Sequence, residues 1–275
     1  MDTTAWIEGD VITNVIRMHF HRTGCSNLPP LVLLHGSSDN GMCWISVANA
    51  LQNDYDVIMP DARGHGLSEA PEIGYESDTM AADVAGLIHA LALGQPVVMG
   101  HSMGAATAAS VAATYPDLVS ALILSDPPWW ADEPAPPTAE QVAERVQRVS
   151  EMRAMSIEEL KALARKEHPN WPEIELGPWA DSKQQHSPYH MSPPRWPRPS
   201  FRTLVPQIQC PVLLLTADPD RGSLVTPEVA AEAAELAQEA RVVRIPGAGH
   251  SIRREQFGPY IEAVRAFLSE MDQRY

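Results

Sequence analysis

The sequence predicts an α/β fold with a mostly parallel twisted sheet, helices on both faces and one inserted helical segment. Short apolar runs recur along the chain, and alanine-rich or amphipathic segments separate them. One stretch rich in proline and tryptophan interrupts this alternation. Buried parallel strands have such continuous apolar runs, and each returns to its neighbour through a right-handed helical crossover.

The elements of the core follow in chain order. An antiparallel pair is expected first, with an edge strand in the alternating residues 11–22. Strands of the parallel sheet are expected at 31–35, 56–60, 96–100, 121–125, 211–217 and 240–246. Helices are expected at 42–53, 78–93, 102–115, 226–239 and 255–270. This pattern assigns residues 1–126 and 207–275 to one core domain.

Residues 127–206 are the predicted insertion, because prolines and tryptophans crowd there and strand-like runs vanish. Helices are expected at 138–152 and 156–168. Ser156 and Glu159 have the S-x-x-E spacing by which a capping serine and its third residue satisfy each other's backbone donors. We expect this segment to form a helical cap, or lid, over a cleft.

Charge and composition limit the partners. The formal net charge of −15 over 275 residues opposes binding to nucleic acid or an anionic membrane. The first residues have no basic and apolar leader pattern, so a cytoplasmic location is expected. Cys25, Cys43 and Cys210 lack metal-ligand spacing, and His19 and His21 lack further ligands. No metal or cofactor is therefore expected, and the oligomeric state stays open.

The segment PVVMGHSMGAAT, residues 96–107, places Ser102 where an expected strand meets an expected helix. This is the context of a nucleophile elbow, a strained turn that exposes a serine hydroxyl. Side chains at Gly100 and Gly104 would collide with the neighbouring strand and helix. The first turn of the helix directs unpaired N–H groups and its positive dipole end at the serine.

A serine nucleophile needs a histidine base and an acid. His250 lies in GAGHS, directly after the last expected strand and therefore at the carboxyl edge of the sheet. The segment TADPDRG, after the preceding strand, supplies Asp218 and Asp220 as acids. The segment DARGHGLS, residues 61–68, is predicted to be structural, with glycines that permit a turn and Arg63 or His65 hydrogen-bonding it.

Five segments occur in a characteristic order: LLHGSSDNG, DARGHGLSEAP, GHSMG, LLLTADPDRG and GAGH. With them the chain resembles α/β-hydrolase fold enzymes of the serine esterase and lactonase type that carry an inserted helical cap. The resemblance implies an oxyanion hole formed by the backbone amides of Met103 and Ser37, with Ser38 as the alternative to Ser37.

The resemblance also bears on the acid of the catalytic triad. In the family the acid commonly stands in a G-x-x-D pattern after its strand, which favours Asp220, although Ala217 occupies the glycine position. Some relatives carry the acid one strand earlier, which corresponds to Asp126. Asp220 is the expected acid, and Asp218 and Asp126 stay open.

These observations predict a cofactor-free carboxylic-ester hydrolase acting through an acyl-enzyme on a small hydrophobic ester or lactone. His250 would take the proton of Ser102, and water would then cleave the acyl-enzyme. Trp129 and Trp130 are either a substrate-binding wall or part of the cap's own core. Carbon-carbon bond hydrolysis, acyl transfer and non-catalytic ligand binding remain alternatives on the same fold.

Overall fold

The computed structural model describes residues 6–24, 27–132, 134–191 and 199–274. In these residues eight strands form one sheet in the order β1-β2-β4-β3-β5-β6-β7-β8. All pairs from β4 to β8 are parallel, whereas β1–β2 and β2–β4 are antiparallel. The strands are β1 (Ile7–Thr13), β2 (Ile16–Arg22), β3 (Pro30–Leu34), β4 (Asp56–Pro60), β5 (Val97–His101), β6 (Ala121–Ser125), β7 (Val212–Thr216) and β8 (Ala240–Arg244). The predicted α/β fold is confirmed.

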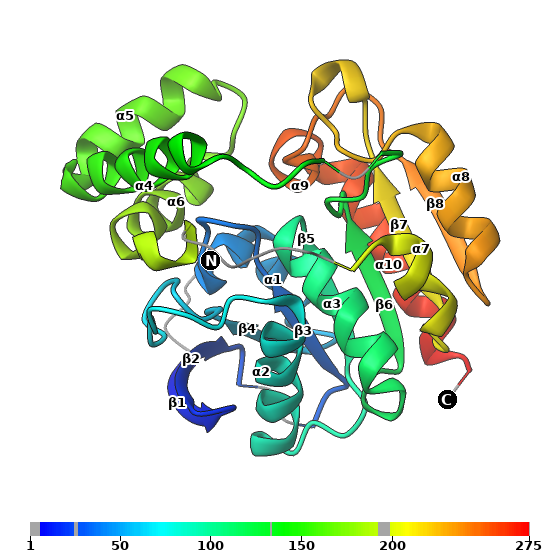
Figure 1. Ribbon diagram of the computed structural model, residues 1–275. Helices are drawn as coiled ribbons and strands as arrows, with labels where there is room; N and C mark the ends of the chain where they lie inside the picture. The colour runs from blue at the N-terminus through cyan, green and yellow to red at the C-terminus, as the bar shows by residue number, and fades with distance from the viewer. Residues whose placement is uncertain (1–5, 25–26, 133, 192–198, 275) are drawn as a thin grey trace.

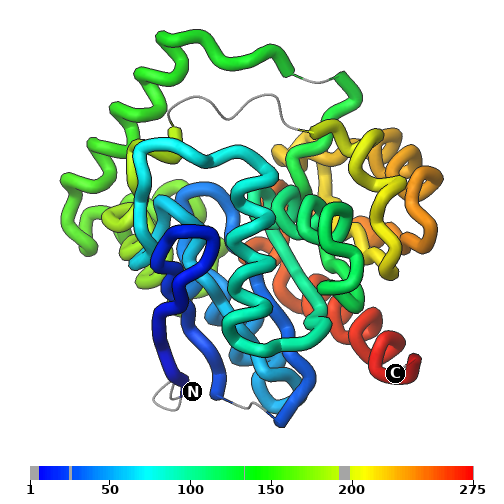
Figure 2. The backbone as a smooth tube through the Cα atoms, turned by 60° about the horizontal axis from the view of Figure 1, so that its bottom comes forward, coloured from blue at the N-terminus to red at the C-terminus, as the bar shows by residue number. Residues whose placement is uncertain are grey.

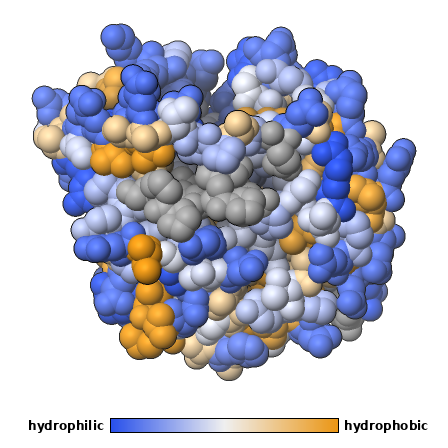
Figure 3. All heavy atoms as spheres, in the orientation of Figure 1, coloured by the Kyte–Doolittle hydropathy of each residue, from blue (hydrophilic) through white to orange (hydrophobic). Residues whose placement is uncertain are grey.

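The antiparallel pair is a tight hairpin. Asn14 and Val15 connect β1 to β2, and both have positive φ angles, 40° and 66°. Two-residue turns with positive φ at both positions match the twist of paired strands. Ile12 and Val15 are 74% and 94% exposed. Figure 3 shows a hydrophobic patch at the lower left of the molecule, on the side where Figure 1 places β1.

Helices cover both faces of the sheet (Figure 1). One face packs against α2 (Ser77–Ala90), α3 (Met103–Thr114) and α8 (Pro227–Leu236). The other packs against α1 (Ile45–Leu51) and α10 (Phe257–Asp272). Burial of each large apolar side chain in these layers contributes about 1.5–3 kcal/mol. Short elements complete the core: α9 (Ile252–Glu255), η1 (Gly41–Trp44), η2 (Pro116–Leu118) and η5 (Pro219–Arg221).

In the described residues between β6 and β7, six helical elements occur. They are α4 (Ala139–Ala154), α5 (Ile157–Glu167), α6 (Glu173–Gln185), η3 (Pro188–Met191), α7 (Phe201–Leu204) and η4 (Val205–Gln207). Figures 1 and 2 show α4, α5 and α6 together at one side, outside the two helical layers of the core. They enclose a small apolar cluster of their own. We call α4–α6 and η3 the cap.

Both predicted cap helices are present, and the capping box at Ser156 and Glu159 is confirmed. Helix α6 is a helix that the sequence did not predict, because Pro178 lies inside it. The ends of the inserted segment pack with the core: Trp129 and Phe201 both belong to its apolar cluster. The expected domain limits at 127 and 206 stay a prediction.

Two further features concern the thiols and membrane-spanning helices. Cys43 and Cys210 are free thiols, and burial raises the pKa of each to about 11. Cys25 lies outside the described residues. Within the part of the chain that the structure describes, no helix combines the length and apolar character needed to span a bilayer.

Candidate active site

Ser102 occupies a sharp turn between β5 and α3, with φ 51° and ψ −117°. Its amide donates a hydrogen bond to the Ser125 carbonyl at 3.0 Å. A Cβ on Gly100 would lie 2.3 Å from the Gly104 carbonyl oxygen, and one on Gly104 would lie 2.1 Å from that of Leu34. Only glycine fits these two positions, so the turn has the geometry predicted for a nucleophile elbow.

The carboxylate that contacts His250 is that of Asp126. The His250 Nδ1 lies 2.6 Å from Asp126 Oδ2. The Asp126 carboxylate is fully buried and also accepts hydrogen bonds from the Ser223 hydroxyl at 2.8 Å and from the amides of Leu224 and Val225 at 2.9 and 3.0 Å. Since a carboxylate in this position is an acceptor, Nδ1 carries the proton and Nε2 is left to accept one.

The structure does not bring Asp220 to the imidazole, contrary to the sequence expectation. Asp220 is an exposed residue of η5. The chain after β7 turns at Gly222, which has a φ of 98°, and presents the amides of residues 224 and 225 to Asp126. The loop after β7 therefore does not supply the acid that contacts His250. It supplies backbone N–H donors that hold Asp126, which follows the neighbouring strand β6.

Asp218 has a structural task. It accepts hydrogen bonds from the Gly247 amide at 2.8 Å and from the Arg244 guanidinium at 2.7 Å. The Gly247 hydrogen bond, and then that of Arg244, hold the pKa of Asp218 below its ordinary value. This carboxylate thus fixes the loop that leads from β8 to His250.

The two residues expected to form the oxyanion hole lie beside the nucleophile. Ser37 and Met103 line the same cavity as Ser102. Met103 is the first residue of α3, so its N–H has no acceptor within the helix and lies at the positive end of the helix dipole. A Cβ on Gly36 would lie 2.8 Å from the His101 ring, so this loop packs closely against the elbow.

A cleft opens over Ser102. It consists of two adjoining cavities of about 330 and 260 Å³. Figure 3 shows a notch at the top of this face, between the cap on the left and the side that carries α8. The two cavities share the lining residues Ser37, Ser38, Ser102, Arg148, Met152 and Lys183. His250 lines the smaller cavity, so Ser102 and His250 border one space.

Trp129 and Trp130, the expected substrate-binding residues, are not among the side chains that line these cavities. Trp129 is 5% exposed and stacks on Phe201 with ring centroids 5.5 Å apart. The chain that leaves β6 follows the core, and α7 covers it, so this large aromatic side chain completes the core. Trp130 is half-buried.

The cleft has a cationic wall that sequence reasoning missed. Arg145, Arg148, Val149 and Met152 of α4 line the larger cavity. Their spacing of i, i+3, i+4 and i+7 marks one helix face, a signal readable in RVQRVSEM. Within the described residues, no carboxylate lies within 4.0 Å of either guanidinium.

Lys183 of α6 ties the cap to the loop beside the nucleophile. Its buried ammonium donates to the Ser38 carbonyl at 2.6 Å and to the Ser38 hydroxyl at 3.0 Å. It also lies 3.4 Å from Asp39 Oδ1. Burial opposes ionisation of Asp39, but the charges of Arg254, Lys183 and Arg253 hold its pKa well below the ordinary range. This ion cluster fixes the loop that carries Ser37.

Other residues of the sequence motifs make structural hydrogen bonds around the site. His101 Nε2 donates to the His250 carbonyl at 2.9 Å, and burial followed by the neighbouring His250 lowers its pKa well below the ordinary value. Arg63 donates two hydrogen bonds to buried Asp83, at 2.5 and 2.6 Å. These contacts tie the DARGHGLS loop to α2.

Residues 31–262 match the model of the alpha/beta hydrolase family, and the chain belongs to that family. It is 29% identical to 2-(acetamidomethylene)succinate hydrolase of Mesorhizobium japonicum over 87% of this chain and 88% of the relative. It is 29% identical to N-formylmaleamate deformylase of Pseudomonas putida over 94% and 96% of the two chains. A thermophilic esterase of Thermogutta terrifontis, solved with malate bound, superposes with a TM-score of 0.71 at 26% identity, covering 96% and 99%.

Proposed function

We propose that the protein is a serine hydrolase that cleaves an ester or amide bond in a small substrate bearing carboxylate groups. The observation that carries this proposal is the pair Arg145 and Arg148 on the wall of the cavity that holds Ser102. Guanidinium groups bind carboxylates through paired, charge-assisted hydrogen bonds. The proposal replaces the small hydrophobic ester or lactone expected from sequence with an anionic substrate.

The mechanism follows from the contacts of His250. Its Nε2 removes the proton of Ser102 as the hydroxyl oxygen attacks the acyl carbon, and Asp126 stabilises the resulting imidazolium. The amides of Met103 and Ser37 hold the developing oxyanion. The imidazolium then protonates the leaving alcohol or amine, and a water molecule activated by the same imidazole releases the acid from the acyl-enzyme.

The relatives support this substrate class. Both 2-(acetamidomethylene)succinate and N-formylmaleamate carry a carboxylate and an acylated nitrogen, and the esterase was solved with the dicarboxylate malate. The names favour an amide-type bond beside the ester expected from sequence. Carbon-carbon bond hydrolysis and acyl transfer use the same triad, and analysis of the products separates them from simple acyl hydrolysis.

The proposal is tested with two aryl esters of similar acyl length, a 4-nitrophenyl hemisuccinate and 4-nitrophenyl butyrate. We expect Arg148→Gln to lower kcat/KM for the anionic ester about 10- to 100-fold, because a charged hydrogen bond contributes about 1.5–3 kcal/mol. The neutral ester should change by less than about threefold, the range of contacts that carry no charge. Steady-state kinetics on both esters measure the difference.

Arg241→Gln is the matched control because it removes the same charge elsewhere. Arg241 of β8 forms an exposed ion pair with Glu270 of α10. This variant should leave both rates unchanged. Equal losses on the two esters in Arg148→Gln, or no loss on either, would argue against a carboxylate-binding wall.

A further inference from the structure

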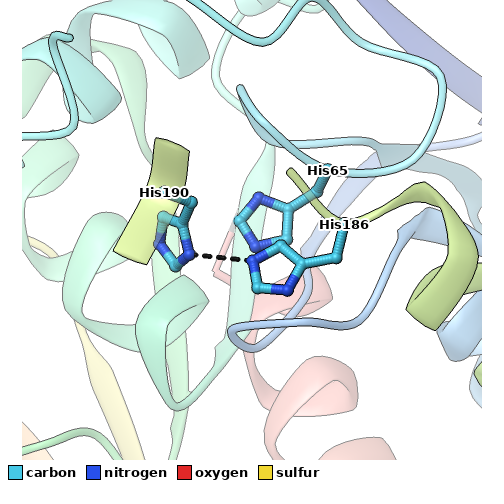
Figure 4. Close-up of side chains that lie close together, drawn as sticks. All are labelled: His65, His186 and His190. Atoms are coloured by element: carbon cyan, nitrogen blue, oxygen red, sulfur yellow. Dashed lines mark hydrogen bonds between the residues drawn. The ribbon is translucent and has the colours of Figure 1, made fainter. Parts of the chain in front are cut away.

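Three histidines lie together where the cap contacts the core. His65 belongs to the loop after β4, His186 follows the end of α6, and His190 lies in η3. Their exposed fractions are 0%, 1% and 0%. Figure 4 shows the three rings gathered together, and one ligand nitrogen from each lies within 4.8 Å of the other two. Burying imidazole rings is costly unless their polar nitrogens find partners.

One lone pair in this cluster is unused. The His65 Nδ1 donates to the Arg63 carbonyl at 2.9 Å, so its Nε2 carries no proton. That Nε2 is buried and has no hydrogen-bond partner. With the proton on Nδ1, the Nε2 lone pair is the atom that an imidazole offers to a metal ion.

The other two rings already face each other. The His186 Nε2 and His190 Nδ1 are 3.1 Å apart and share a proton (Figure 4). Two imidazole nitrogens at this distance are nearly as far apart as two ligands of a tetrahedral zinc ion, about 3.4 Å for bonds of 2.0–2.1 Å. A tautomer change of one ring would move the shared proton away and free both nitrogens.

We infer that His65, His186 and His190 bind one divalent transition-metal ion of the zinc type, which fastens the cap to the core. Three imidazoles suit zinc better than magnesium or calcium, which prefer oxygen ligands. Because the nitrogens lie up to 4.8 Å apart, binding requires them to close by up to about 1.4 Å. The broad χ2 range of histidine permits such a ring rotation.

The position of the site gives it a mechanical role. His65 belongs to the core, and the other two ligands belong to the cap, where the Ser187 amide already donates to the Gly64 carbonyl at 2.8 Å. His186 also lines the larger cavity above Ser102. A metal ion here would fix one wall of the cleft and stabilise the folded chain in proportion to its binding.

The sequence held a partial signal for this site. His186 and His190 have the H-x₃-H spacing found in zinc sites, and His65 stands 121 positions earlier in a segment interpreted as structural. The expectation of no metal rested on the cysteines and on the pair His19 and His21, for which no further ligands were expected. The fold joins ligands that no local pattern connects.

The test uses the full chain without an affinity tag, stripped with EDTA and dialysed. Calorimetric titration with Zn²⁺ should show one ion per chain, and the same protein titrated with Co²⁺ should give the visible absorption of a tetrahedral site. At zinc 100-fold above its Kd, Tm should rise by about 5 °C. A wild-type chain that binds neither ion overturns the inference.

Variants assign the ligands. His190→Gln should remove both the tight zinc binding and the shift in Tm. His21→Ala is the control, because Glu8, His19 and His21 form the other group of possible ligands within the described residues. Zinc binding that survives His190→Gln or disappears in His21→Ala overturns the inference. If His190→Gln does not fold, the Co²⁺ spectrum of the wild type compared with that of His21→Ala decides the question.

Discussion

Asp126 is a fully buried carboxylate that accepts hydrogen bonds from a hydroxyl, two backbone amides and the His250 ring. An asparagine at this position keeps the size but places an amide group against donors, and it removes the charge that stabilises the imidazolium. We expect Asp126→Asn to lower kcat by up to about 10⁴-fold, the loss known for this change in a serine protease. Turnover of the hemisuccinate ester measures it, with circular dichroism to verify folding.

Asp220→Asn is the matched comparison, because the same change is made in an exposed residue of η5. Its kcat should stay within about twofold of the wild type, as expected for an exposed position without specific contacts. If Asp220→Asn were the more damaging variant, the acid would have to be reassigned to the loop after β7.

The positions of Ser102 and His250 at the sheet edge were predictable because local sequence determines them. The two flanking glycines and the alanine-rich helix mark the elbow, and the histidine follows the last strand directly. Asp126 was only one of three candidates, since its role depends on Ser223, Leu224 and Val225, which fold back from the next strand. Contacts of this kind have no signature in the spacing along the chain.

At the scale of elements, α4 and α6 contribute differently to the cleft. Helix α4 presents arginines that have no ion-pair partner in the described residues, whereas Lys183 of α6 is engaged with the Ser38 carbonyl and with Asp39. The first arrangement is suited to select a substrate, and the second to hold the Ser37 loop. Substitutions in the two helices should therefore have different kinetic signatures.

Lys183→Met removes the ammonium but keeps most of the apolar length of the side chain. We expect kcat to fall about tenfold for the anionic and the neutral ester alike, because the loop carrying the Ser37 amide loses its anchor and one oxyanion donor is worth about 10²–10³ when removed entirely. Steady-state kinetics on both esters check this. A loss confined to KM for the anionic ester would instead make Lys183 a substrate-binding residue.

The core elements followed their sequence patterns, and the cap did so only in part. Buried strands such as β5 and β6 are continuous apolar runs, which leave little choice of structure. Helices α4 and α5 begin with capping boxes. Helix α6 has Pro178 within it and lacks an apolar stripe, so tertiary packing around Trp179 determines its structure.

At the scale of the whole molecule, the parallel sheet gathers distant residues at one edge. Ser102 follows β5, Asp126 follows β6 and His250 follows β8, so three carboxyl ends of strands supply the residues of the proposed triad. Open α/β sheets place their sites at this edge. Residues of the cap line the cleft over this edge, and they share no sequence pattern with the core.

The central claim, that this arrangement activates Ser102, is tested most directly by labelling the full chain with a fluorophosphonate and measuring its intact mass. We expect one adduct per chain, mapped by peptide analysis to Ser102, and no adduct on the folded Ser102→Ala variant. Asp220→Asn should label at the rate of the wild type, whereas Asp126→Asn should label far more slowly. A folded wild-type chain that takes up no probe, or that carries the adduct on another residue, would contradict the account.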